Sequence, residues 1–538
     1  MRIAEERKNS HKIAIIIIRQ SDEYVRQMQR YLEALHIPAG YEAEILLSSP
    51  EGGLAHAFAA GMHASDAKYK VYIPPQTVIV HERLLEDCLA IFQYDADSGA
   101  IGVLGAGQLS TTTELYRSYH LQGRLLFGDG GQIIPEGGQE KLSQVQILSE
   151  NIFVTQYDVP WREAAGMGDD YVFRAQSIEF TRCGYKLVVP PQDDFWVIGS
   201  LEHSEESTKA AFLAEYAKDI YPLISIVIPT YERPEYFRQA LDSVLAQDYC
   251  NLDIFITDNS HNDDTEQLMQ AHYLGDERIK YIHNREWGAK ENWESALGYN
   301  NPQAEYVNWL MDDDIFMPGK LSVMMEYFFQ YPQVGMVTSY RGRINAEGGI
   351  IEDRQASLPD GGQVVYMNGR DAGRQMLLAV SDDLGEPTTP LLKKKYMRDG
   401  YTLGWNIISW RYFVVDFTTW LNMLMTCDCL FLLKSYSYFR DHEGSSSKQW
   451  QTQCAIFICW ADCIKKAIDD GIYLVEASDK QQSITTWLTR VGALLQEVGR
   501  NKYYSNYVED LQIVYAAMEN ALQNGYKIEF KLRNRYDA

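Results

Sequence analysis

The chain is short of positive charge for its length. Its 538 residues include 49 Lys and Arg against 74 Asp and Glu, which gives a formal net charge of −25. This balance disfavours nucleic acid and anionic membrane surfaces as partners, because both attract clustered Lys and Arg. Any phosphate-bearing ligand must therefore be bound with local help, from a metal ion, a helix N-terminus or single basic residues.

Long apolar runs are also absent. No run of 18 apolar residues occurs, and the most apolar stretch, from Met423 to Leu433, is interrupted by Asp428. The charged segment MRIAEERKNSHK leads directly into an expected strand and lacks the pattern of a signal peptide. We expect a soluble, cytoplasmic protein, with no more than peripheral contact at the inner face of the membrane.

Two familiar glycine and cysteine patterns are missing. The eight cysteines are scattered, and the pair Cys427 and Cys429 lacks the CxxC spacing of zinc and redox sites. Buried, reduced thiols are the expected interpretation. The Gly-rich stretch 123–138 lacks the order GxGxxG and a following helix, so we predict a surface loop there.

Length and composition indicate several globular domains. Hydrophobic residues make up 46% and charged residues 23%, and 538 residues exceed what one core usually serves. We expect three parts, at residues 1–215, 216–449 and 450–538. Apolar stripes at helical spacing in the last part predict a C-terminal helical subdomain, with a partner-docking surface as the alternative interpretation.

An internal repeat relates the first two parts. Residues 67–94 and 304–331 align without a gap and share Ala, Tyr, Leu, Phe, Gln and Tyr at equivalent positions. Further upstream, Ile13–Ile18 and Ile224–Ile228 are each followed by Glu-Tyr and, one residue later, by Arg-Gln. One α/β unit has therefore been used twice.

Each copy begins with a short β-branched run, typical of a strand buried on both faces. In the second copy an amphipathic helix follows, with Pro234 in its first turn, and then a strand at 253–257 that ends in the polar turn 258–264. Polar residues at the C-terminal ends of such strands predict a doubly wound α/β fold with its ligand site at that edge.

Three consecutive carboxylates, Asp312, Asp313 and Asp314, follow the apolar strand at 306–310. At about 4 Å and an effective dielectric near 20, each like-charge pair costs roughly 4 kcal/mol. A divalent cation removes that cost, and hard oxygen ligands suit Mn²⁺ or Mg²⁺. Such an ion could stabilise a departing diphosphate. A solvated turn is the alternative.

Several segments in order carry a resemblance to a known family: SIVIPTYERPEYFRQALDSVLAQDY, ITDNSHNDDT, NREWGAKENWESAL and YVNWLMDDDIFMPGKL. Together with GEPTTPLL, VVDFTTWLNML and YSYFRDHEGSSSKQ further on, they resemble the GT-A glycosyltransferases of family 2 over residues 221–449. The resemblance implies a metal-dependent, inverting transferase of the hexosyltransferase class. It would move a sugar from a nucleotide-diphospho-sugar, expected to be a UDP-sugar, to a hydroxyl of a glycan, glycolipid or protein acceptor.

The resemblance also implies which residues bind the donor. They are Pro229, Thr230, Tyr231, Asp258, Lys290, Asp312 and Asp313. A solvated surface lysine is the alternative interpretation of Lys290. The family often has Asn-Arg after the Thr-Tyr pair, whereas this chain has Glu232 and Arg233, which puts the contact at position 232 in doubt.

The remaining implied roles concern the metal, the base and the acceptor. Asp314 would be the principal metal ligand, and His442 would complete the metal shell. Asp416 would take the acceptor's proton, with Asp382 and Asp383 as alternatives. The acceptor would touch two further residues, Glu386 and Trp405.

The first copy lacks the residues that these roles require. Residues 75–77, which match the acidic triplet, read Pro-Gln-Thr. At the later acidic position stands Ala175, although Asp169 and Asp170 lie just upstream. We predict a degenerate glycosyltransferase-like domain without metal-dependent catalysis, serving as a scaffold, a dimer surface or an acceptor-binding module. A second, metal-independent active site is the alternative.

Two other classes compete with the transferase hypothesis. A non-catalytic scaffold could bind sugar or nucleotide in both copies without turnover, and a homo-oligomer is compatible with either class. A nucleotidyltransferase would also place acidic residues and a metal at strand ends. It would need a Gly-rich, basic loop after the first strand, and residues 230–233 are Thr-Tyr-Glu-Arg.

Overall fold

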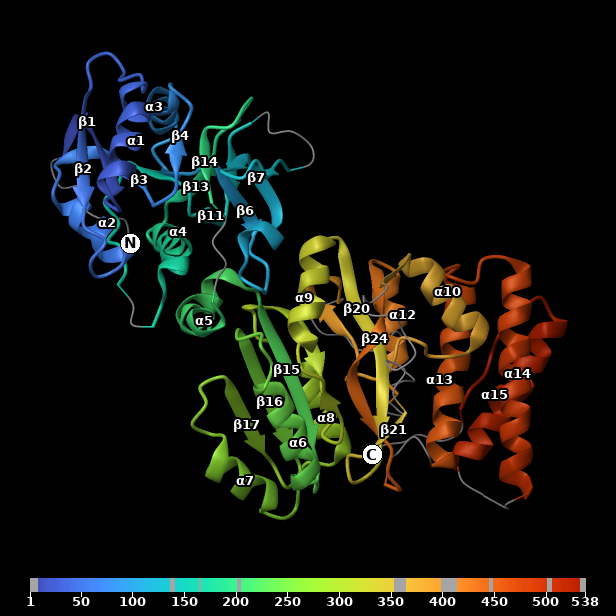
Figure 1. Cartoon of the computed structure of the whole chain (residues 1–538). Coiled ribbons are helices and arrows are strands. Elements are labelled where there is room, and N and C mark those ends of the chain that lie inside the picture. The colour runs from blue at the N-terminus through green and yellow to red at the C-terminus, as the bar shows by residue number, and fades with distance from the viewer. Residues whose placement is uncertain are drawn as a thin grey trace. The chain divides into compact units, whose positions relative to one another are not determined.

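The computed structural model describes residues 8–135, 141–163, 166–200, 205–352, 364–397, 414–444, 449–500 and 506–532. The chain divides into two compact units, residues 1–221 and 222–538 (Figure 1). No described helix is long and apolar enough to cross a membrane.

The first unit is built on a seven-stranded sheet in the order β10-β13-β5-β12-β3-β1-β2. Its strands are β1 (Asn9–Ile18), β2 (Glu42–Ser48), β3 (Ala67–Ile73), β5 (Ser98–Ile101), β10 (Ser143–Val145), β12 (Phe153–Thr155) and β13 (Lys186–Val189). Strands β2, β1 and β3 are parallel, whereas β12 runs antiparallel between β3 and β5. The isoleucines of β1 are buried, as the β-branched run predicts.

Helices and two small sheets complete the first unit. The helices are α1 (Asp22–Glu33), α2 (Leu54–His63), α3 (Leu84–Tyr94), α4 (Val172–Arg182) and α5 (Glu206–Ile220). One small sheet contains β11 (Ile147–Leu148), β6 (Leu104–Gln108) and β7 (Tyr119–Gly123). The other contains β4 (Val78–Ile79), β14 (Val197–Gly199), β8 (Leu125–Phe127) and β9 (Gln132–Ile133).

The prediction of a surface loop at 123–138 is wrong for its central part. Strands β8 and β9 form an antiparallel hairpin, with Leu125 opposite Ile133. Gly130, at φ +90°, lies between the two strands directly after Asp129. Asp-Gly is a strong hairpin signal, because the turn needs a residue at positive φ. Gly128, Gly130 and Gly131 thus belong to the turn between two strands of a sheet.

The second unit contains a ten-stranded mixed sheet, with the path β17-β16-β15-β18-β23-β20-β24-β19 and two further strands paired to it. Its strands are β15 (Leu223–Thr230), β16 (Leu252–Asp258), β17 (Ile279–His283), β18 (Ala304–Trp309), β19 (Ile315–Phe316), β20 (Val334–Ile344), β21 (Ile350–Glu352), β22 (Val364–Met367), β23 (Leu391–Lys393) and β24 (Asp428–Arg440). Strands β17, β16, β15 and β18 are parallel, as the doubly wound pattern predicts, and β23 adds to β18 in the antiparallel sense.

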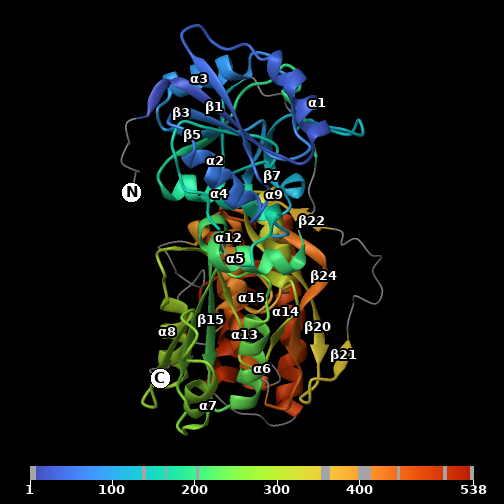
Figure 2. The same cartoon turned by 60° about the vertical axis from the view of Figure 1, so that its left-hand side comes forward.

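Helices pack around this sheet, and the last three form a separate C-terminal layer. They are α6 (Pro234–Leu245), α7 (Asp264–His272), α8 (Ala289–Gly298), α9 (Lys320–Gln330), α10 (Gly369–Ala379), α12 (Asp416–Leu424), α13 (Trp450–Asp469), α14 (Ala477–Arg500) and α15 (Asn506–Gln523). The last three pack against one another, and α13 and α14 also contact α10 (Figures 1 and 2). Trp460 of α13 stacks on Phe417 of α12 at 4.1 Å, within a core continuous with the sheet.

Register in the parallel part of the second sheet determines where the polar loops meet. Thr230 at the end of β15 lies opposite Asp258 at the end of β16, which in turn lies opposite His283 of β17. On the other side, Val227 of β15 pairs with Trp309 of β18, just before the acidic triplet. The C-terminal ends of these strands therefore bring their loops to one edge of the sheet.

Candidate active site

A cavity of about 810 Å³ lies at this edge of the second unit. Its walls come from the ends of β15 and β16, the loop before α8, the acidic triplet, the segment before β23 and the start of α12. Eight of the residues predicted from the sequence line it: Pro229, Thr230, Tyr231, Asp312, Asp313, Asp314, Glu386 and Asp416. Residues from distant parts of the sequence thus meet around one space.

The other predicted residues have different positions. Asp258 and Lys290 do not line the cavity, although their neighbours Asn259 and Ala289 do. His442 lies behind the wall, in contact with Asp313 at 2.9 Å. Trp405 lies outside the described residues.

Asp258 stabilises the turn that follows β16. It is fully buried, its Oδ1 accepts a hydrogen bond from Ser260 N at 2.8 Å, and its Oδ2 accepts one from the Tyr281 hydroxyl at 2.7 Å. The contact with a base predicted for Asp258 stays a prediction. At this strand end the wall of the cavity is formed by Asn259 and His261.

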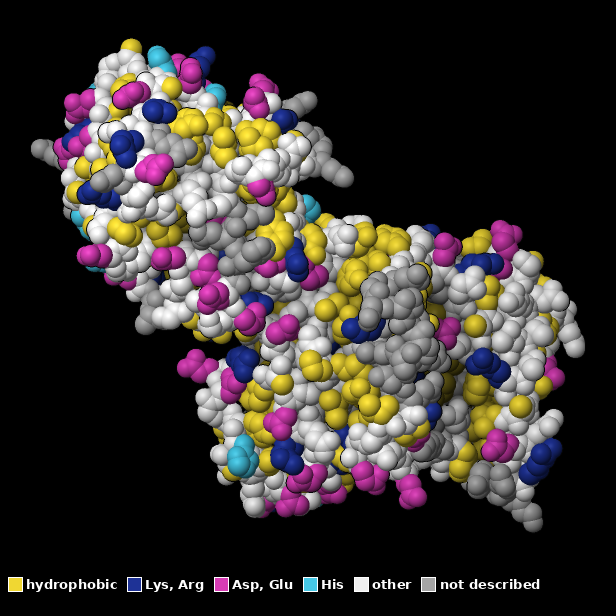
Figure 3. Space-filling view, viewed as in Figure 1, with side chains coloured by type: hydrophobic (Ala, Val, Ile, Leu, Met, Phe, Trp, Pro, Cys, Tyr) yellow, Lys and Arg dark blue, Asp and Glu magenta, His cyan; other side chains and the backbone are white. Residues whose placement is uncertain are grey.

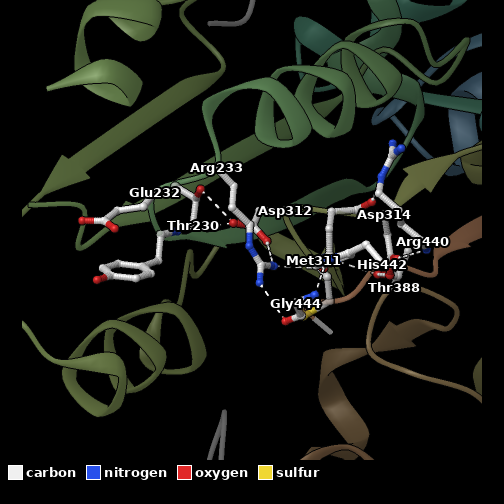
Figure 4. Close-up of polar contacts among 12 residues, drawn as sticks. Thr230, Glu232, Arg233, Met311, Asp312, Asp314, Thr388, Arg440, His442 and Gly444 are labelled. Atoms are coloured by element: carbon white, nitrogen blue, oxygen red, sulfur yellow. Dashed lines mark hydrogen bonds and ion pairs between the residues drawn. The ribbon is translucent and has the colours of Figure 1, made fainter. Parts of the chain in front are cut away.

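The turn after β15 contains a strained residue. Glu232 has φ +50°, in the left-handed region that Asn adopts far more readily than Glu. Its amide donates to Ser260 Oγ at 2.8 Å, and its carboxylate accepts from His261 N at 3.4 Å. Two hydrogen bonds to the neighbouring loop therefore hold a conformation that the Asn common in the resembled family would take more easily. The turn presents Arg233 to the acidic triplet (Figure 4).

Within the acidic triplet, Asp312 is the residue that is hydrogen-bonded to the end of β15. Its Oδ2 accepts from Thr230 Oγ1 at 3.0 Å and from Tyr231 N at 3.3 Å. Burial raises the pKa of Asp312 to about 7, and the neighbouring charge of Asp313 adds to the rise, while Arg233 opposes it. Thr230 and Tyr231 thus fix the first carboxylate at the cavity wall.

Asp313 meets two nitrogen donors at a single oxygen atom. Its Oδ2 lies 3.0 Å from Arg233 Nη1 and 2.9 Å from His442 Nε2. His442 Nδ1 accepts a hydrogen bond from Gly444 N at 3.1 Å, so that Nε2 must carry the ring proton and donate to Asp313. His442 is consequently an orienting donor in this arrangement.

Asp314, predicted as the principal metal ligand, is turned into the protein. It is 1% exposed, its Oδ1 accepts from Arg440 N at 3.0 Å, and its Oδ2 accepts from Thr388 Oγ1 at 2.6 Å. Burial raises the pKa of Asp314 well above its usual value, followed by the charges of Asp313 and Glu386. Each of its oxygens already has a protein donor, and the ligand role stays a prediction.

Two buried cations that sequence reasoning did not assign support this turn. The Arg440 guanidinium donates from Nε to Asp313 O at 2.7 Å and lies 4.6 Å above the Tyr236 ring. Lys320 is fully buried and donates to the carbonyls of Thr388 and Thr389 at 3.0 and 2.7 Å. Burial lowers the pKa of Lys320 to about 7. Arg440 lies in the segment YSYFRDHEGSSSKQ, two residues before the predicted His442, and that segment is the sequence signal for this region.

Two carboxyl groups, Glu386 and Asp416, line the cavity, and a third, Asp382, does not. Asp416 begins α12, and burial raises its pKa. Burial raises the pKa of Asp382 as well, and the charge of Asp416 adds to the rise. The pKa of Glu386 is raised by burial too, and its Oε2 forms an ion pair with Arg341 Nε at 2.8 Å. A base with a raised pKa suits proton abstraction near neutral pH.

In the first unit the sequence comparison places Ala175 at the later acidic position. The residue just before it in α4 is the buried Arg174. Arg174 is 2% exposed, lies 3.9 Å from Glu150 and donates to Asp170 O at 2.5 Å. A buried guanidinium cannot act as a base.

On the face seen in Figure 3, Lys and Arg side chains are scattered among acidic ones.

No three His, Cys, Asp or Glu side chains of the described residues are grouped so as to hold a metal ion by themselves. The cavity does offer Asp313, whose side chain is 18% exposed and whose oxygens are hard ligands. Mg²⁺ in such sites commonly keeps several waters and uses one or two carboxylates together with substrate phosphates. The donor set fits an ion that arrives with a diphosphate.

Comparisons with known proteins agree with this arrangement. Residues 14–216 match the family model described as "Glycosyltransferase like family", and residues 225–379 match "Glycosyl transferase family 2". An uncharacterized glycosyltransferase of Rickettsia felis is 40% identical over 102 residues, which are 19% of this chain and 16% of that protein. The GalNAc(5)-diNAcBac-PP-undecaprenol beta-1,3-glucosyltransferase of Campylobacter jejuni is 32% identical over 105 residues, 20% of this chain and 34% of that protein.

The matched segments thus span about a third or less of the length of these two relatives. Among solved structures, S. aureus TarS 1-349 in complex with UDP aligns with a TM-score of 0.36 and 14% identity, covering 56% of this chain and 89% of that one. This likeness is too distant to support an argument. The family matches confirm the predicted tandem arrangement: the chain carries two α/β glycosyltransferase domains of the family 2 type, one after the other.

Proposed function

We propose that the second unit transfers a sugar from a nucleotide-diphospho-sugar to an acceptor hydroxyl with inversion, and that its single active site is the cavity at the strand ends. The observation that carries the proposal is that the acidic triplet and Asp416 line one cavity. The triplet lies within residues 225–379, which match a glycosyltransferase family, and Asp416 lies beyond that segment. A UDP-sugar as donor and a hexose as the transferred group follow from the family resemblance.

The nucleotide side is formed by the ends of β15 and β16. Tyr231 is 44% exposed, and its ring meets that of His261 edge to face at 6.0 Å. A base can stack on such rings, while Asn259 offers an amide for its polar edge. Arg233 and Arg285 on the same wall are the cationic groups for phosphate, in place of the predicted Lys290.

Asp313 is the residue we assign to a divalent ion, Mn²⁺ or Mg²⁺, in preference to Asp314. This assignment is supported by the partly exposed side chain of Asp313 and by the buried, doubly hydrogen-bonded carboxylate of Asp314. When bound, such an ion offsets the negative charge that develops on the departing diphosphate. Asp314 fixes the turn through Thr388 and Arg440.

Asp416 acts as the general base. It takes the proton from the acceptor hydroxyl as that oxygen attacks the anomeric carbon, opposite the bond to the diphosphate. The bond from the anomeric carbon to the diphosphate oxygen breaks, and its electron pair leaves with the nucleoside diphosphate. Attack from the opposite side inverts the anomeric configuration. Glu386 lies on the same wall and orients the acceptor, held in place by Arg341.

The first unit serves as a non-catalytic domain in this proposal. Its support is Ala175 at the later acidic position, next to the buried Arg174, and the Pro-Gln-Thr sequence at the place of the triplet. The C-terminal helices from residue 450 support the catalytic sheet through the core that they share with α12.

A donor-hydrolysis screen tests the proposed function. The full chain is incubated with common UDP-, GDP- and TDP-sugars, with and without Mn²⁺, and release of the nucleoside diphosphate is measured. We expect metal-dependent release from one donor. Nucleotide binding without release from any donor, in the presence of added sugar acceptors, would favour the non-catalytic scaffold, and release independent of metal would remove the ion from the proposal.

A further inference from the structure

We propose that Arg233 is the built-in cation of the acidic triplet, and that it makes binding of a divalent ion at Asp313 conditional on a bound diphosphate. The inference rests on the proposed function and adds a specific role for a residue that the sequence left unassigned. Arg233 occupies the position next to Asp313 until a ligand of greater negative charge draws it away.

The contacts of Arg233 carry the first step of the argument. Its Nη1 lies 3.0 Å from Asp313 Oδ2 and 3.5 Å from Asp312 Oδ1, and its Nη2 donates to Gly444 O at 3.3 Å (Figure 4). One guanidinium thus contacts two of the three carboxylates, offsets part of their charge and joins them to the turn after β24. The sequence predicted that a metal ion would be needed to relieve the repulsion among the three aspartates. Arg233 already relieves part of that repulsion from within the protein.

Two side chains donate to one oxygen of Asp313. Oδ2 accepts from Arg233 and also from His442, whose ring proton is fixed on Nε2 by the bond from Gly444 N to Nδ1. An ion that binds Oδ2 must displace both donors, and an ion that binds through Oδ1 still lies close to the positive guanidinium. Binding of the ion alone is therefore opposed by charge repulsion and, at Oδ2, by lost hydrogen bonds as well.

A diphosphate reverses this balance. Arg233 lines the cavity and its side chain is 35% exposed, so the guanidinium can turn toward a phosphate that enters there. Arginine binds phosphate through paired hydrogen bonds, which replace those given up at the carboxylates. The same diphosphate offers oxygen ligands to the ion, since these sites combine protein carboxylates with substrate phosphates. The released Asp313 and the nucleotide together then complete a site that the protein lacks alone.

The backbone favours a movement of the side chain alone. Glu232, just before Arg233, is held at φ +50° by Ser260 and by His261 N, so the turn stays in place while the guanidinium swings. Gly444 loses its bond from Arg233 in the same movement, which frees the turn that holds His442. Arg233 therefore couples the nucleotide, the ion and the turn after β24.

Mn²⁺ binding to the full chain, followed by electron paramagnetic resonance, tests this role without any turnover. The variant is Arg233→Met, and the matched control is Arg238→Met, because Arg238 lies on α6 and bonds to Glu235 on the surface. Mn²⁺ is titrated alone and then in the presence of UDP or GDP. We expect wild type and Arg238→Met to bind Mn²⁺ weakly alone and more tightly with one of the nucleotides.

The Arg233→Met protein should bind Mn²⁺ alone about tenfold more tightly than wild type, the change expected when one charge-assisted hydrogen bond no longer has to be broken. The increase in Mn²⁺ affinity on adding the nucleotide should be smaller for this variant than for wild type. Circular dichroism of both variants shows whether they fold. Equal Mn²⁺ affinity of wild type with and without both nucleotides would overturn the proposal without reference to any variant. Unchanged Mn²⁺ affinity in folded Arg233→Met would overturn it as well.

These outcomes are separable from failure of the proposed function. If donor hydrolysis is observed but Mn²⁺ never binds, even with nucleotide, the metal assignment fails and the role of Arg233 falls with it. If Mn²⁺ and nucleotide bind together as expected but no donor is hydrolysed, the role of Arg233 stands and the transferase function fails.

Discussion

The two units of this chain share one plan and differ at the residues that could do chemistry. Both begin with parallel strands, and both place a helix before a late strand of the sheet. In the first unit that helix carries Arg174, buried and bonded within the protein, whereas in the second it begins with Asp416 beside a cavity of about 810 Å³. The comparison teaches that one fold can carry different residues at the positions where chemistry is expected, and we predict that only the second unit is catalytic.

The largest expected effect separates the two units directly. Asp416→Asn should lower the rate of donor hydrolysis roughly 10²- to 10⁴-fold, the usual contribution of a general base, because the amide cannot accept the proton. In the first unit, Gln76→Asn changes a residue at the place of the acidic triplet, and Asn tolerates its φ of +63°. That control should leave the rate unchanged. A comparable loss in both proteins would refute a single active site.

A second comparison distinguishes two neighbours in the triplet. Asp313→Asn should reduce hydrolysis about 10²-fold and raise the Mn²⁺ concentration needed for half-maximal rate, because the ion loses a charged ligand. Asp314→Ala should lower the free energy of unfolding by about 1–3 kcal/mol, because Arg440 N and Thr388 Oγ1 lose their acceptor. Mn²⁺ dependence and thermal unfolding of the two variants are measured side by side. Equal changes in Mn²⁺ dependence would contradict the assignment to Asp313.

The pH dependence of hydrolysis tests the ionisation of Asp416 and its neighbouring carboxyl groups. Asp416 must be ionised to act as a base, so its raised pKa predicts that the rate falls at a higher pH than for an ordinary aspartate. Burial, and then the charge of Asp416, raises the pKa of Asp382 well above its usual value, and burial raises the pKa of Glu386, which pairs with Arg341. Asp382 therefore stays protonated while Asp416 ionises, and Asp382→Asn should leave the acid limb where it is in the wild type. A limb that moves to lower pH in this variant would show that Asp382 is charged while Asp416 titrates.

The smallest effect concerns backbone strain. Replacing Glu232 by Asn should stabilise the second unit by about 0.5–1 kcal/mol, because Asn adopts positive φ more readily than Glu. The loss of the bond from His261 N to the Glu232 carboxylate reduces this gain. Chemical unfolding followed by fluorescence measures the change. A destabilised variant would show that the bond to His261 outweighs the strain.

Local sequence predicted the strand and helix plan, and the family matches confirm the tandem glycosyltransferase domains. It could not predict which carboxylate of the triplet stays partly exposed and which is buried. The turn that holds Asp314 bonds to Thr388 and Arg440, which lie 74 and 126 residues away in the chain, and these partners decide its orientation. Asp258 is a similar case, since its burial depends on Tyr281 of the next strand. Polar residues at strand ends indicate a site, but tertiary partners select which of them reach the ligand.

Crystals of the full chain soaked with Mn²⁺ and the hydrolysed donor give the most direct test of a single metal-assisted site. Anomalous scattering should reveal one manganese ion beside Asp313, between that carboxylate and the diphosphate, and none at residues 75–77 of the first unit. A manganese ion in the first unit, or a bound donor with no ion beside Asp313, would contradict the account.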